Sequence, residues 1–159
     1  MTVQVSPTLD RPVDAGRAFL GPDAGYYDEA WRVMAWRGRR WRWNGAAFLF
    51  GPLWLAWRRM HLPALAYLAF LSLLEPLAWR GTPPPVLAFL VLGAMTLQGG
   101  FGNALYLRHF ARVNRRIERA RLAPAAHEAE LAAQGGTNPL LVVTAGLCLG
   151  VLVVRPVIF

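Results

Sequence analysis

Few residues in this chain have the types and spacing that catalysis or metal binding requires. His127, Glu128 and Glu130 lie close together in an alanine-rich stretch, but one histidine and two glutamates at this spacing do not form a metal-ligand pattern. We expect them at the surface. Cys148 is the single cysteine, which excludes an intrachain disulfide. The sequence contains no Ser/His/Asp set, phosphate-binding loop or paired intramembrane carboxylates. It therefore predicts no catalytic, cofactor-binding or metal-binding residues and gives no positive indication of an enzyme.

A different chemistry, the binding of anionic groups, is suggested by arginines interleaved with tryptophans near residues 36–43. All 17 basic residues are arginine, the net charge is +8, and the arginines flank apolar stretches rather than covering a soluble fold. This distribution favours anionic lipid headgroups over nucleic acid, which we rank last although such a segment can also stack on single strands. The predicted lipid- or partner-binding residues are Arg39, Arg40, Arg42, Trp41, Trp43, Trp54, Arg58, Arg59, Arg108, Arg112, Arg115, Arg116 and Arg119.

The apolar stretches between the arginine clusters indicate a membrane protein. Hydrophobic residues make up 55% of the chain, which is high for a soluble domain. We expect an all-α integral membrane protein with three transmembrane helices, an interfacial or re-entrant amphipathic helix and short cytoplasmic helices. The expected spans are residues 61–79, residues 86–107 (continuing as a basic helix to 121) and residues 139–159. The other expected elements are a flexible tail over 1–22, a juxtamembrane helix over 23–37, the interfacial helix over 44–57 and a short helix over 123–134.

The stretch over 44–57 is the least certain to span. Its apolar run of twelve residues, 46–57, would reach about 18 Å as a helix, against a hydrocarbon core of about 30 Å. Fusing it with the next apolar run would place Arg58 and Arg59 in mid-membrane, at about 2.5–3.5 kcal/mol each. Gly51-Pro52 also interrupts the helical pattern. An interfacial or shallow re-entrant helix fits best, with a spanning helix and an ordinary soluble core segment as alternatives.

Several small and polar residues within the apolar runs predict helix packing. Glycines let two helices approach closely, and amide side chains form hydrogen bonds across the contact. The predicted packing residues are Gly99, Gly102, Asn103 and Tyr106, which share one side of a helix, and the G-x-x-x-G pair Gly146 and Gly150. Glu75 and Gln98 are polar residues inside the predicted spans. In the alternative hypothesis of an oligomeric transporter or channel component, Glu75, Gln98 and Asn103 would line a polar route.

The arginine distribution also predicts orientation. With the N-terminus in the cytoplasm, nine arginines from Arg11 to Arg59 and six in the 108–121 segment lie inside, and only Arg80 and Arg155 lie outside. This asymmetry follows the positive-inside rule. No cleavable signal peptide is expected, because residues 1–20 have no apolar core region. We therefore predict a multi-pass protein with a cytoplasmic N-terminus.

The run from Trp43 to Trp54, with the pattern Trp-Asn-x-x-Ala-Phe-x-Phe-Gly-Pro-x-Trp, resembles the signature of a family of small bacterial inner-membrane proteins catalogued only as a domain of unknown function. The resemblance covers about residues 19–140 and also includes Gly102-Asn103, Tyr106 and Gly135-Gly136-Thr137. It implies a location in the bacterial inner membrane and supplies no catalytic residues. We expect a non-enzymatic accessory or scaffold protein that binds the phospholipid bilayer through anionic headgroups and contacts another membrane protein or a second copy of itself.

Overall fold

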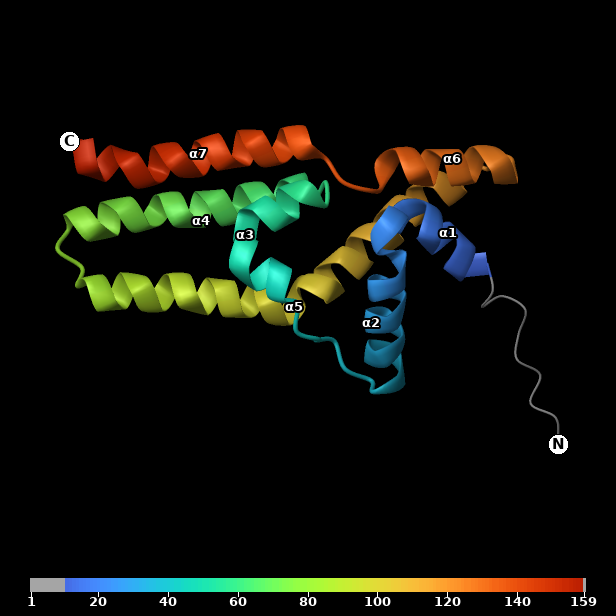
Figure 1. Ribbon diagram of the computed structural model, residues 1–159, viewed down its shortest axis with the longest axis horizontal. Coiled ribbons are helices and arrows are strands. Elements are labelled where there is room, and N and C mark those ends of the chain that lie inside the picture. The colour runs from blue at the N-terminus through green and yellow to red at the C-terminus, as the bar shows by residue number, and fades with distance from the viewer. Residues whose placement is uncertain (1–10, 159) are drawn as a thin grey trace. The chain divides into compact units, whose positions relative to one another are not determined.

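The structure is entirely helical in the part of the chain that it describes. The computed structural model describes the backbone of residues 11–158 and the side chains of residues 16–151, and within these ranges it contains no strand. The elements, shown in Figure 1, are α1 (Arg11–Leu20), a 3-10 helix (Gly21–Asp23), α2 (Ala24–Trp36), α3 (Gly45–Trp57), α4 (His61–Trp79), α5 (Pro84–Arg119), α6 (Pro124–Gln134) and α7 (Pro139–Ile158).

The helix boundaries follow local signals in the sequence. Asn44 caps α3, because its side-chain oxygen accepts a hydrogen bond from the backbone N–H of Ala47. Pro124 and Pro139 are the first residues of α6 and α7, where the missing proline N–H costs nothing. Pro84 and Pro85 likewise lie in the first turn of α5.

Residues 11–22 differ from the expected flexible tail. They form α1 and most of the 3-10 helix, and Phe19 and Leu20 at the end of α1 are fully buried. Isolated helices of ten residues are marginal in water, so α1 depends on these tertiary contacts. Residues 1–10, the rest of the predicted tail, lie outside the described residues.

The chain divides into two compact units. The first, in its described part, consists of residues 11–40 and 104–136, which include α1, α2, the C-terminal part of α5 and α6. Tyr27, Tyr106 and Leu131 are its large buried side chains, together with Phe19 and Leu20. Two glycines after α6 allow the chain to pack closely against the end of α1. The N–H of Gly136 donates to the carbonyl of Phe19 over 2.7 Å, and a side chain on Gly135 would clash with the Phe19 backbone.

The second unit comprises residues 41–103 and 137–159, which include α3, α4, the N-terminal part of α5 and α7. Helix α3 packs against α4 and α7, and α4 also contacts α7. The N–H of Asn138 donates to the carbonyl of Trp57 over 3.0 Å, which attaches the start of α7 to the end of α3. Helix α3 is therefore partly a core element of this unit, with Leu55 and Ala56 among its buried residues.

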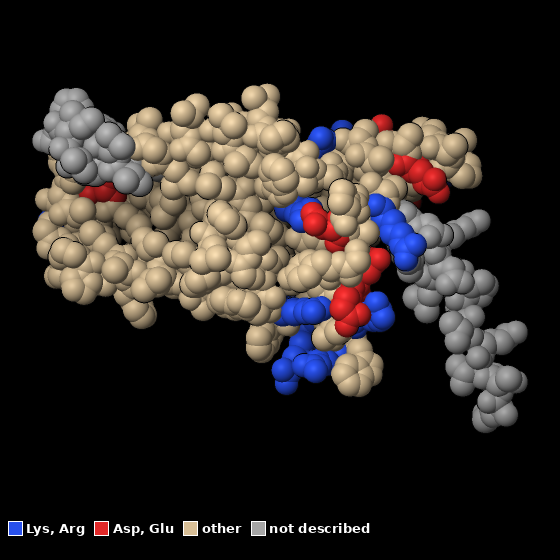
Figure 2. Space-filling view, in the orientation of Figure 1, with Lys and Arg blue, Asp and Glu red and all other residues tan. Residues whose placement is uncertain are grey.

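Two helices, α4 and α5, are long and apolar enough to cross a membrane. The buried share of the apolar window is only 6% in α4 and 17% in α5, whereas the core helix of a soluble protein would be mostly buried. Helix α7 covers residues 139–158, but its side chains are described only to residue 151, and its crossing remains a prediction. Figure 2 shows charged side chains gathered over the first unit, while the visible surface of the second unit is almost entirely uncharged.

Candidate functional site

A buried pair of asparagines joins the start of α3 to α5 inside the second unit. Asn44 and Asn103 are 3% and 0% exposed, and the side-chain Nδ2 of Asn44 donates to Oδ1 of Asn103 over 2.9 Å. Nδ2 of Asn103 in turn donates to the backbone carbonyl of Arg42 over 3.2 Å. Because Oδ1 of Asn44 also caps α3, these two side chains satisfy each other and two backbone groups where water is excluded.

The extended segment before α3 is held by its backbone as well. The N–H groups of Arg42 and Asn44 donate to the carbonyls of Gly100 and Gly99, over 3.2 and 2.7 Å. A carbonyl has two lone pairs, so a carbonyl within a helix can accept a second hydrogen bond if a donor can approach it. At Gly99 the approach depends on the missing side chain, because a Cβ there would lie 2.8 Å from Cβ of Phe48.

A kink in the middle of α3 is the third contact with α5. Gly51 has φ 46° and ψ −120°, a left-handed conformation that glycine adopts without a side-chain clash, and Pro52 follows it. Figure 1 shows the resulting bend in α3. The carbonyl of Gly51 accepts a hydrogen bond of 2.6 Å from Nε2 of the buried Gln98. The predicted interruption at Gly51-Pro52 is thus stabilised by a polar side chain from α5.

The structure separates the residues that the sequence placed on one packing face of α5. Gly99, Gly102 and Asn103 face α3 in the second unit, whereas Tyr106 belongs to the first unit. There its ring centroid lies 4.8 Å from that of Tyr27 and 5.7 Å from that of Phe19. One helix face therefore packs against different partners along its length.

Of the G-x-x-x-G pair in α7, Gly146 faces α3. A Cβ on Gly146 would lie 3.9 Å from Leu53, an ordinary contact, while a Cβ on Gly150 would meet nothing within 4 Å among the described atoms. Glu75 lies half-buried on α4. Apart from Tyr106, the predicted packing and polar residues thus lie at several separate places in the second unit.

The matched segment identifies the family. The family model described as "Protein of unknown function (DUF2628)" matches residues 22–112, which is more than half of the chain. The chain belongs to this family. No curated protein and no solved structure matches it.

The match to DUF2628 runs from the 3-10 helix through α2, α3 and α4 into α5. It contains Asn44, Gly51, Gln98, Gly99 and Asn103, so the attachment of α3 to α5 lies entirely within the family region. Gly135-Gly136-Thr137, which contributed to the resemblance seen in the sequence, lies beyond the match. Helix α6 and helix α7 also follow it.

Two residues predicted to bind lipid are buried instead. Trp54 is 5% exposed, because its ring packs against Gly102, where a Cβ would lie only 3.5 Å from the ring. Arg58, the C-cap residue of α3 in the short turn that leads to α4, is 6% exposed. Both side chains are thus largely enclosed within the second unit, and their role in lipid or partner binding stays a prediction. Arg59 is half-buried in the same turn, with a left-handed φ of 56°.

The other predicted binding residues are accessible. In the second unit Trp41 and Trp43 are 53% and 48% exposed and Arg42 is half-buried. In the first unit Trp36, which belongs to the basic and aromatic stretch noted near residues 36–43 and is the last residue of α2, is 81% exposed. The exposed arginines of the first unit are Arg17, Arg32, Arg37, Arg39, Arg40, Arg108, Arg112, Arg115, Arg116, Arg119 and Arg121.

Proposed function

We propose that this protein is a small bacterial inner-membrane protein that acts as a non-enzymatic accessory or scaffold. In this proposal it binds anionic phospholipid headgroups and contacts a membrane partner. The main support is that Trp36, Trp41 and Trp43 are exposed and are close in sequence to arginines that are also exposed. Tryptophan rings are stable at the headgroup level of a bilayer, and each arginine near an anionic surface contributes roughly 1 kcal/mol.

The apolar surface of α4 supports the same proposal. Leu62, Leu65 and Leu73 are each more than half exposed, and large exposed leucines on one helix are unfavourable in water. Contact with lipid chains would remove this cost. In this arrangement α3 is a re-entrant helix. It is too short to span, it is kinked at Gly51, and part of it is buried against α4 and α7.

We further propose three crossings by α4, α5 and α7 with the N-terminus in the cytoplasm. The arginine asymmetry supports this orientation, because fifteen of the 17 arginines then lie on the cytoplasmic side. Reporter fusions to the two ends of the chain test the topology. Opposite locations for the two ends are expected, and a shared location would exclude an odd number of crossings.

Lipid preference is tested by reconstituting the protein in nanodiscs with equal amounts of phosphatidylglycerol and phosphatidylcholine. The protein is then extracted in mild detergent, and the lipids that remain bound are measured by mass spectrometry. We expect at least a twofold enrichment of phosphatidylglycerol over the bulk composition. Co-purified lipid of bulk composition would refute anionic selectivity. Crosslinking in native membranes tests the partner, and recovery of uncrosslinked monomer alone would refute the scaffold role.

We do not propose a transport function. Gln98 and Asn103, which would line a polar route, donate hydrogen bonds to the backbone of Gly51 and Arg42. Their amides support the local fold of the second unit, and no other observation favours a pore.

A further inference from the structure

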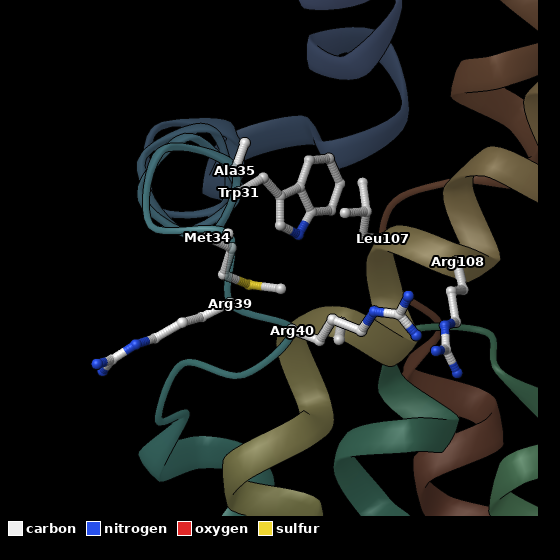
Figure 3. Close-up of a pocket in the computed structure, with 9 residues that line it drawn as sticks. Trp31, Met34, Ala35, Arg39, Arg40, Leu107 and Arg108 are labelled. Carbon is white, nitrogen blue, oxygen red and sulfur yellow. The ribbon is translucent and has the colours of Figure 1, made fainter.

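The first unit contains an open groove between α2 and the C-terminal part of α5, with a volume of about 510 Å³. Its floor is apolar and includes Trp31 and Met34 from α2 and Leu107 from α5. Figure 3 shows the Trp31 ring extending from α2 toward Leu107, so both helices contribute to the floor. The volume falls in the range of ordinary small-molecule sites.

Three arginines also line this groove, Arg39, Arg40 and Arg108. Figure 3 shows that the Arg40 side chain reaches toward Arg108, while Arg39 points away from both. Within the described part of the chain, neither Arg40 nor Arg108 has a carboxylate or hydrogen-bond partner. Two guanidinium groups that converge without a counter-charge repel each other, and an anion between them would remove this repulsion. Guanidinium groups favour phosphate because they can donate two parallel hydrogen bonds to it.

We propose that this groove binds one anionic phospholipid, with its phosphate between Arg40 and Arg108 and its glycerol and first chain carbons on Trp31, Met34 and Leu107. This inference rests on the proposed function, and it assigns headgroup binding to one defined site. An apolar floor beside arginines matches an amphiphile, because a free phosphate would leave the floor uncovered. The orientation of Trp31 is independently fixed, since its ring stacks on Phe110 at a centroid distance of 5.6 Å and an interplanar angle of 19°.

The test uses the full chain in maltoside micelles, titrated with dioctanoyl-phosphatidylglycerol in a calorimeter. We expect one lipid per chain. The double substitution Arg40→Gln and Arg108→Gln should weaken binding about tenfold or more, because each arginine contributes roughly a factor of five near an anionic group. The matched control is Arg116→Gln with Arg119→Gln, which removes the same charge from α5 outside the groove. It should change the affinity less than about threefold by the loss of long-range attraction.

Further arms separate the possible ligands. Dioctanoyl-phosphatidylcholine and inorganic phosphate should each bind at least about tenfold more weakly, because one lacks the net charge and the other lacks the apolar part. Leu107→Ala should weaken lipid binding and leave phosphate binding unchanged. Arg40→Lys with Arg108→Lys keeps the charge but loses the paired hydrogen bonds, so it should give an intermediate affinity and should fold normally at these exposed positions.

The outcomes distinguish the two proposals. If both double variants weaken binding equally, the assignment to the groove is overturned while the proposed anionic-lipid function stands. If phosphate binds as tightly as the lipid, the groove is an anion site and the lipid assignment is overturned. If the wild-type chain does not distinguish the anionic from the zwitterionic lipid, both proposals fail.

Discussion

The buried asparagine pair allows a quantitative test of how α3 is attached to α5. Asn103→Ala leaves Nδ2 of Asn44 and the carbonyl of Arg42 without these hydrogen bonds. The buried amide of Asn44 left unsatisfied costs about 1–3 kcal/mol and the part-buried carbonyl of Arg42 about 1 kcal/mol, so we expect a loss of roughly 2–4 kcal/mol in the free energy of unfolding. Asn44→Ala removes the α3 cap, at about 1 kcal/mol, and leaves Oδ1 of Asn103 unsatisfied, for a similar total.

The double variant should be more stable than the sum of the two single effects predicts. Each single variant leaves one buried amide group without its hydrogen-bond partner. The double variant removes both amides, so the cost of the broken Asn44–Asn103 hydrogen bond enters only once. We expect a coupling of about 1–3 kcal/mol, in the range found for residues in direct contact. The assay is reversible unfolding in mixed micelles with increasing denaturing detergent, followed by circular dichroism.

The control cycle combines Asn103→Ala with Ser72→Ala, an exposed residue of α4 whose hydroxyl donates to its own helix. These two effects should add within about 0.5 kcal/mol. If the asparagine cycle is also additive within that limit, the pair does not stabilise the attachment of α3, and the reasoning fails.

Three further substitutions test packing and exposure. Gly99→Ala would place its Cβ 2.8 Å from a side chain of α3, and we expect it to lower the free energy of unfolding by roughly 1–3 kcal/mol in the same assay. The control Gly93→Ala, which has nothing within 4 Å, should be neutral or slightly stabilising. Gly135→Ala would collide with the backbone at the end of α1 and should increase amide hydrogen exchange in α1, while Gly25→Ala in α2 should leave it unchanged; equal exchange in both variants would refute the predicted clash. Trp36→Ala should change the free energy of unfolding by less than about 0.5 kcal/mol but should reduce quenching of tryptophan fluorescence by lipids brominated near the headgroup; undiminished quenching would show that this ring is outside the bilayer.

Most helices were predictable because their ends carry local signals. These signals act within a few residues. They are Asn44 before an apolar run, the prolines at the starts of α6 and α7, and the basic residues in the C-terminal part of α5. Helix α1 escaped prediction because its stability comes from a distant partner. Its end is held by the N–H of Gly136, more than a hundred residues later in the chain.

The sequence predicted that a helix contact exists at the candidate site but not which residues pair across it. Polar and small residues in α5 indicated a helix contact, but the sequence does not reveal that Asn103 pairs with Asn44, which is 59 positions away. The burial of Trp54 depends on the space left by Gly102, and that match appears only in three dimensions. Composition predicts which residues favour an interface, whereas tertiary packing decides which of them reach it.

The two backbone hydrogen bonds that join residues 42–44 to Gly99 and Gly100 have a consequence for how the sequence of this segment can change. The two bonds join main-chain atoms only, so they do not depend on which side chains the segment carries. Position 41 precedes these residues and is exposed, and neither of the two hydrogen bonds involves its side chain. Under the proposed lipid-binding function, substitutions at this position can therefore change the affinity for a bilayer without breaking either hydrogen bond.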